Sequence, residues 1–153
     1  MYIVLHSGPD SLLDEILTAC DSHSVCFVDD GQRIQKGIYV SRPRRHLVVN
    51  AKTLGVSETT APKREYWIPS IDELFESTAK SQGAQSIGVI LSGTMHDGVA
   101  GLLAIRKAGG ITIAQEPEEA QCPEMPFAAL EAKAVDYCLP IKDIAAKLTE
   151  LAG

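Results

Sequence analysis

The stretch IGVILSGTMHDGVAGLLAIRKAGGITIAQ, residues 87–115, decides the fold class of this chain. It opens with an apolar run, Ile87–Leu91, that does not alternate with polar residues, as is typical of a parallel strand buried on both faces. A glycine-rich turn leads into a helical pattern from Val99 to Ala108, and Ile111–Ala114 is the next apolar run. This order of strand, turn, helix and strand predicts a parallel sheet covered by helices.

The same alternation extends toward the N-terminus. Short apolar runs at Tyr2–Leu5 and Val25–Val28 predict strands, and a helical pattern opens after Pro9. A β excursion is expected around residues 37–50. The segment Thr53–Pro69 is polar and irregular, so we expect a surface loop there.

The alternation also continues through the C-terminal third. Ser70 and Glu73 have the spacing of a capping box, which predicts a helix to about Ser81. Beyond the central unit we expect a loop over Glu116–Pro126, a short helix, a strand at Val135–Leu139 and a final amphipathic helix. The sequence therefore predicts an α/β fold with three layers, in which helices cover both faces of a mostly parallel sheet, as a single domain over residues 1–153.

Composition excludes several classes of function. The 153 residues are 45% hydrophobic and 22% charged, which is typical of a folded domain, and the formal net charge of -6 opposes binding to nucleic acid. The four cysteines form no metal-binding spacing, so neither a metal nor another cofactor is expected. The N-terminus resembles no signal segment and no apolar run is long enough for membrane insertion, so we expect a cytoplasmic protein.

Polar residues follow two of the predicted strands where ligands usually bind, at the carboxyl ends of a parallel sheet. His6 follows Tyr2–Leu5 directly, and Asp97 lies in the loop after Ile87–Leu91. A histidine oriented by a carboxylate forms two-thirds of a hydrolase triad, and N–H groups of the turn Gly93–Met95 are suited to an oxyanion. On the residues alone, the simpler roles are an N-cap for the helix from Val99 and a structural histidine at a strand end.

Longer motifs narrow the choice. They are DDGQRIQKGIYVSRPRRHLVV from Asp29, PSIDELFESTAKSQG from Pro69, the stretch from Ile87 quoted above, and EMPFAAL from Glu124. In this order they resemble the catalytic domain of the chemotaxis protein-glutamate methylesterases. The resemblance implies hydrolysis of glutamyl methyl esters and deamidation of glutamines on a methyl-accepting receptor.

The resemblance also implies roles for single residues. Asp97 matches the triad aspartate, and YIVLHSGPDSLLDEIL from Tyr2 resembles the family segment that contributes the triad histidine, which is His6 here. The turn with the oxyanion amide is represented by Thr94, Met95 and Gly98. Met125 and Pro126 correspond to a substrate loop.

The chain departs from the family pattern at the nucleophile. The family serine lies in a Gly-Ala-Ser-x-Gly-Gly turn, and Met1 begins after the position expected for that segment, so we expect a domain shortened at its N-terminus with impaired or absent catalysis. In an alternative alignment Ser7 is the nucleophile, with a base such as His96. The family also usually has glycine where this chain has Glu124.

Two interactions with other proteins are expected as well. If catalysis is absent, the chain is a signalling or binding module, and the basic loop Arg42–Arg45 would contact an acidic partner. A shortened sheet would leave the strand Tyr2–Leu5 uncovered, which predicts a homodimer through this strand.

Overall fold

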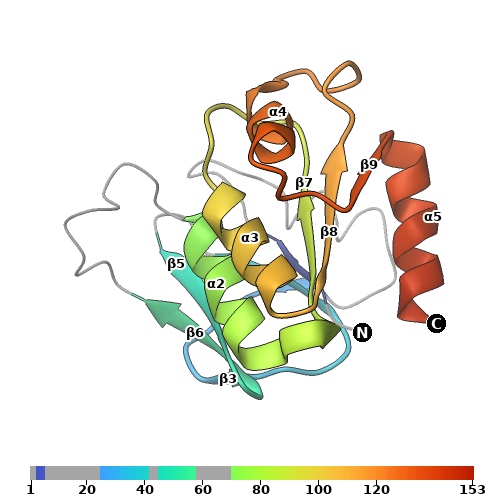
Figure 1. Ribbon diagram of the computed structural model, residues 1–153. Coiled ribbons are helices and arrows are strands. Elements are labelled where there is room, and N and C mark those ends of the chain that lie inside the picture. Colours follow the sequence, from blue (N-terminus) through green and yellow to red (C-terminus); the bar gives the residue numbers. More distant parts are fainter. Residues whose placement is uncertain (1–2, 6–24, 42–44, 58–69) are drawn as a thin grey trace.

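The computed structural model describes residues 3–5, 25–41, 45–57 and 70–153. Within these ranges the chain has an α/β fold with nine strands and four α-helices (Figure 1). Two of the three-stranded sheets are parallel and one is antiparallel, so the strands are mostly parallel, as the sequence predicted.

The C-terminal sheet positions the candidate site. Its parallel strands have the order β7-β8-β9, with bounds Ile87–Ile90, Ile111–Gln115 and Tyr137–Leu139. Helix α3 (Val99–Lys107) connects the first pair of strands, α4 (Glu124–Glu131) connects the second, and α5 (Ile141–Ala152) follows. These bounds confirm the elements predicted for residues 87–152 to within a few residues.

Strand β8 is the centre of this sheet. The side chains of Thr112, Ile113 and Ala114 are all fully buried, because α3, α4 and α5 all contact this strand. In Figure 1, α2 and α3 lie to the left of the strands and α5 to the right. Burial on both faces was predicted for β7, but there it alternates, since Gly88 and Ile90 are buried while Ile87 and Val89 are only half-buried. The strand that is buried on both faces is β8.

A second parallel sheet has the strand order β1-β4-β2. Strand β4 (Ile38–Val40) lies between β1 (Ile3–Leu5) and β2 (Val25–Phe27), and it pairs in parallel with both. Its Tyr39 and Val40 are buried. Part of the region expected as a β excursion is thus a central strand of the parallel architecture.

The antiparallel sheet has the order β3-β6-β5, with bounds Gln32–Arg33, Thr53–Ser57 and His46–Asn50. The expectation of a surface loop from residue 53 is wrong for its first five residues, because β6 pairs with β5 along its whole length. The connection is the two-residue turn Ala51-Lys52, in which Ala51 adopts a positive φ of 42°. Leu54 then points into the core, fully buried.

Helix α2 (Ile71–Gln82) joins the antiparallel sheet to the C-terminal sheet, since it packs on both β5 and α3. Phe75 contacts hydrophobic clusters on both sides. The two helices approach closely at Gly101, where an added Cβ would lie 2.4 Å from the Cβ of Phe75. Among the described helices none is long and apolar enough to cross a membrane.

Candidate active site

The segments that follow β7 and β8 meet at the carboxyl edge of the C-terminal sheet. The Gly93 N–H donates to the Cys122 carbonyl at 2.9 Å, and the Met125 N–H donates to the Gly93 carbonyl at 3.0 Å. Ser92 accepts a third bond, from the Cys122 N–H to its hydroxyl, at 2.9 Å. Backbone contacts therefore fix the turn after β7 against the start of α4.

The two residues predicted for the substrate loop, Met125 and Pro126, lie where the turn after β7 meets the start of α4. Pro126 is fully buried, and Met125 is half-buried against Gly93, where an added Cβ would lie 2.7 Å from its methyl carbon. A larger residue at position 93 would therefore displace the end of the Met125 side chain. Met125 therefore packs against the turn after β7, and Pro126 belongs to the buried interior.

The turn itself carries an unusual backbone conformation. Met95 has a φ of 68°, in the left-handed region that residues with a side chain rarely adopt, and its side chain is 49% exposed. Its N–H donates to the carboxylate Oε2 of Glu124 at 2.8 Å. Such conformations concentrate at functional sites, where the surrounding structure compensates their cost. Thr94 is exposed beside it.

Gly98, by contrast, has a packing role. It is buried at the N-cap of α3 with a φ of 98°, and an added Cβ would lie 2.8 Å from Ile71 Cγ2 and 2.9 Å from Ile90 Cδ1. The residue predicted as part of the site loop thus permits α2, β7 and the turn to pack together.

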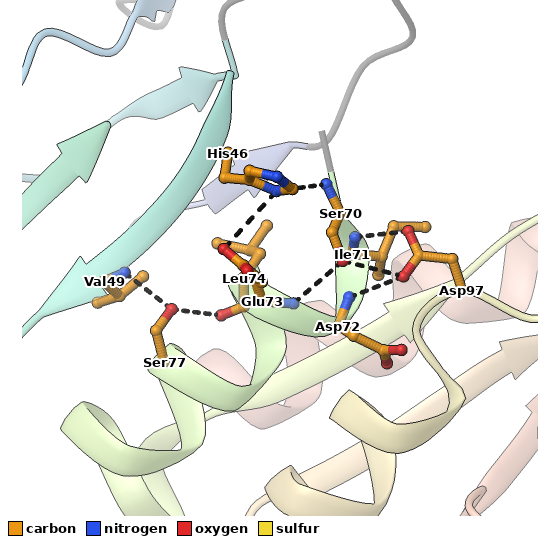
Figure 2. A network of polar contacts seen from close by, with 9 residues as sticks. All are labelled: His46, Val49, Ser70, Ile71, Asp72, Glu73, Leu74, Ser77 and Asp97. Atoms are coloured by element: carbon orange, nitrogen blue, oxygen red, sulfur yellow. Dashed lines mark hydrogen bonds and ion pairs between the residues drawn. The ribbon is translucent and has the colours of Figure 1, made fainter. Parts of the chain in front are cut away.

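Asp97 is buried, with 7% of its surface exposed, and caps a helix (Figure 2). Its Oδ2 accepts from the Ile71 N–H at 2.7 Å, and its Oδ1 accepts from the Asp72 N–H at 3.1 Å and the Ser70 hydroxyl at 3.2 Å. These donors belong to the start of α2. The alternative in which Asp97 caps the helix from Val99 is therefore wrong about the helix, since the N-cap of α3 is Gly98 and has no side-chain cap.

The N-terminus of α3 receives its carboxylate from α2 in return. Asp72 Oδ1 accepts from the N–H of Gly101, in the first turn of α3, at 2.7 Å. The first N–H groups of any helix lack partners within the helix, and they carry the positive end of its dipole. Asp97, in the turn that precedes α3, thus accepts from the start of α2, and Asp72, in the first turn of α2, accepts from the start of α3.

A buried histidine for which no role was predicted from the sequence completes the polar network. His46, at the start of β5, is 1% exposed, and its Nδ1 accepts from the Ser70 N–H at 3.1 Å (Figure 2). In the neutral ring the hydrogen is therefore on Nε2, which has no hydrogen-bond partner within the described ranges. The histidine was overlooked because it follows the basic run Arg42–Arg45, although it also begins an apolar strand.

His46 also changes the predicted capping box. The Ser70 hydroxyl accepts from the Glu73 N–H at 3.4 Å, as predicted, but the Ser70 N–H goes to His46 and not back to Glu73. The Glu73 carboxylate lies 3.6 Å from His46 Nδ1 instead. Only half of the predicted box forms, because the neighbouring strand supplies the second acceptor.

A second polar network in the C-terminal sheet centres on the carboxylate of Asp136, which precedes β9 and bonds to residues of α3 and β8. Burial raises the pKa of Asp136, but hydrogen bonds from the Thr112 hydroxyl, from Arg106 and from the Thr112 N–H outweigh burial and hold this pKa below its ordinary value. The bond from Arg106 Nε measures 2.8 Å. Helix α3, strand β8 and the segment before β9 are therefore tied by one ionised group.

Comparison with known proteins identifies the family. A sequence model of the CheB methylesterase matches residues 1–148, nearly the whole chain. This chain belongs to the CheB methylesterase family. The crystal structure of the Thermotoga maritima CheB methylesterase catalytic domain superposes with a TM-score of 0.87 at 27% sequence identity, covering 98% of this chain and 82% of that one.

Curated relatives agree with this assignment to the CheB family. The chain is 36% identical over 132 residues to protein-glutamate methylesterase/protein-glutamine glutaminase 3 of Burkholderia thailandensis, covering 84% of the chain and 37% of that protein. It is 36% identical over 146 residues to a putative protein-glutamate methylesterase/protein-glutamine glutaminase of Leptospira interrogans, covering 94% of the chain and 75% of that protein. The chain thus spans little more than a third of the Burkholderia protein.

The predicted histidine and serine of this CheB-family chain, His6 and Ser7, lie outside the described residues, so the triad pairing stays a prediction. Asp97 is compatible with it. An ionised carboxylate offers about four acceptor positions, and the three donors from α2 and its cap leave room for an imidazole N–H. Within the described ranges no group of three or more histidine, cysteine or acidic side chains is arranged to hold a metal ion.

Proposed function

We propose that this chain is a protein-glutamate methylesterase domain that acts on glutamyl methyl esters and glutamines of a chemotaxis receptor in the cytoplasm. One observation supports it most strongly. A buried carboxylate with a remaining acceptor position, Asp97, lies two residues after a strained turn whose Met95 N–H already binds a carboxylate. Acyl-transfer enzymes combine these two elements, an orienting aspartate and an oxyanion donor.

In the proposed reaction Asp97 orients His6, and His6 accepts a proton and returns it. The Met95 N–H stabilises the negative charge on the ester oxygen as the tetrahedral intermediate forms. A nucleophile must form and release the acyl intermediate, and the family motif assigns no serine among these 153 residues to that role. We therefore propose that the chain tested by itself turns over esters slowly or not at all.

Turnover of a peptide containing a glutamate methyl ester, measured as methanol release, tests this proposal. We expect little activity from the chain alone, since the oxyanion donor and binding by themselves retain only a small residual rate. Robust hydrolysis that Ser7→Ala abolishes, together with labelling of Ser7 by a serine-directed probe, would establish the alternative nucleophile. Robust hydrolysis that is unaffected by Asp97→Asn would refute the role of Asp97.

The second candidate is a signalling module that binds a receptor without modifying it. Three exposed apolar side chains near the turn favour it: Leu91 is 44% exposed, Met95 49% and Phe127 53%. Binding of a receptor helix that Phe127→Ser weakens, with no product formed, would support this function over hydrolysis.

We also propose that the chain forms a homodimer through β1. In the part of the chain that the structure describes, β1 pairs only with β4, so one side of the strand has no described partner there. Light scattering over a wide concentration range tests this, and a strictly monomeric species would rule it out.

A further inference from the structure

The N–H of Met95 already binds an anion that belongs to the chain. Glu124 is the first residue of α4, and its Oε2 accepts from Met95 at 2.8 Å while both residues are exposed to solvent. A glutamate in this helical position ordinarily interacts with the dipole of its own helix. Here the carboxylate instead reaches the turn after β7, on a different segment.

The contact is not needed to hold the two segments together. Four other hydrogen bonds already join them, two between Gly93 and the backbone of Cys122 and Met125 and two between the Ser92 hydroxyl and the backbone of Cys122. Because Met95 is exposed, water would satisfy its N–H if the carboxylate were absent. Glu124 therefore adds a negative charge to the donor without a corresponding structural requirement.

The chemistry of this ligand matches the proposed reaction. Hydrolysis of a glutamyl methyl ester, or deamidation of a glutamine, leaves a glutamate side chain whose carboxylate is the same group that Glu124 presents. Glu124 Oε2, which accepts from the Met95 N–H, then occupies the place of a carboxylate oxygen of the product. In the substrate the same place would be taken by the carbonyl oxygen of the ester.

We propose that Glu124 is a built-in product mimic, which occupies the Met95 N–H and competes there with the glutamyl group of the substrate. This inference rests on the proposed function for the identity of the competing ligand. It predicts that the chain is self-inhibited, and that removing the Glu124 side chain opens a subsite for side-chain carboxylates.

The test measures carboxylate binding, so it does not depend on turnover. The probe is N-acetyl-glutamic acid α-amide, whose one carboxylate is on the side chain, titrated into ¹⁵N-labelled protein while the Met95 amide resonance is followed. We expect Glu124→Ala to bind the probe about tenfold more tightly than the original chain, because the probe no longer displaces a charge-assisted hydrogen bond.

Glu131→Ala is the matched control. The Glu131 carboxylate is also exposed and lies at the C-terminal end of the same helix, α4, so the variant has the same change in net charge. We expect its Met95 resonance and its affinity for the probe to equal those of the original chain. A well-dispersed spectrum of each variant shows that it is folded.

The outcomes separate this inference from the proposed function. If Glu124→Ala and the original chain bind the probe equally, or if Met95 does not respond in either, the inference is wrong whatever the esterase assay shows. If only Glu124→Ala binds tightly, with Met95 as the responding amide, the inference is supported even where no ester is hydrolysed.

Discussion

Replacing Asp97 with asparagine should destabilise the whole domain. In the better orientation, the amide oxygen takes the place of Oδ1 and keeps the bonds from Ser70 and Asp72, while the amide NH₂ faces the Ile71 N–H that now donates at 2.7 Å. One charge-assisted bond is lost, which costs about 1.5–3 kcal/mol. Loss of the negative charge at the start of α2 adds roughly 0.3–1 kcal/mol.

We therefore expect Asp97→Asn to lower the free energy of unfolding by about 3 kcal/mol, the sum of these two contributions. For a domain of this size the midpoint of thermal unfolding should fall by roughly 6–12 °C. Urea unfolding and thermal unfolding, both followed by circular dichroism, measure the two quantities. The matched control is Asp143→Asn, which removes an exposed carboxylate from the first turn of α5 and should lower the stability by no more than about 1 kcal/mol.

Two results would refute this reasoning. If Asp97→Asn and Asp143→Asn have equal stability, Asp97 does not cap α2. Additive effects of Asp97→Asn and Ser70→Ala would also contradict the network, because the two side chains share a hydrogen bond at 3.2 Å and residues in one network normally couple.

Two further predictions concern the contacts around α3. Gly101→Ala should destabilise the domain by roughly 1–3 kcal/mol, because the new methyl group overlaps Phe75 and the helices must separate, and a stability within about 0.5 kcal/mol of the original chain would show that they separate easily. Asp136→Asn should destabilise the chain at pH 7, and the difference should shrink on acidification. Folding lowers the pKa of the Asp136 carboxyl from 3.8, so its stabilisation of the fold is complete above that value and is lost as the pH falls through the lower pKa of the folded state. A difference in stability that is independent of pH from 7 to 2 would contradict this assignment.

The sequence predicted the C-terminal half of the fold well because its signals are local. The apolar run from Ile87, the glycines after α3 and the cap at Ser70 each lie within a few residues of the element that they define. Strand β6 was missed because its turn contains Ala51 in a left-handed conformation, where Asn-Gly is the usual signal.

The site was predicted less completely because its contacts join distant segments. Asp97 was recognised as important, but its partners at the start of α2 begin 27 residues earlier, at Ser70. His46 meets Ser70 across 24 residues, and Glu124 meets Met95 across 29. No local spacing encodes such pairs, so they appear only once the strands and helices are assembled.

The exchange of carboxylates between α2 and α3 makes the two helices one cooperative unit. If the first turn of α2 unwinds, Asp97 loses its donors and the Gly101 N–H loses the carboxylate of Asp72. The cost of opening either end is therefore shared by both, and neither helix can fray by itself at the end nearest the site. Local melting near the candidate active site then requires the loss of both helix starts, which keeps the turn that bears Met95 in place between such events.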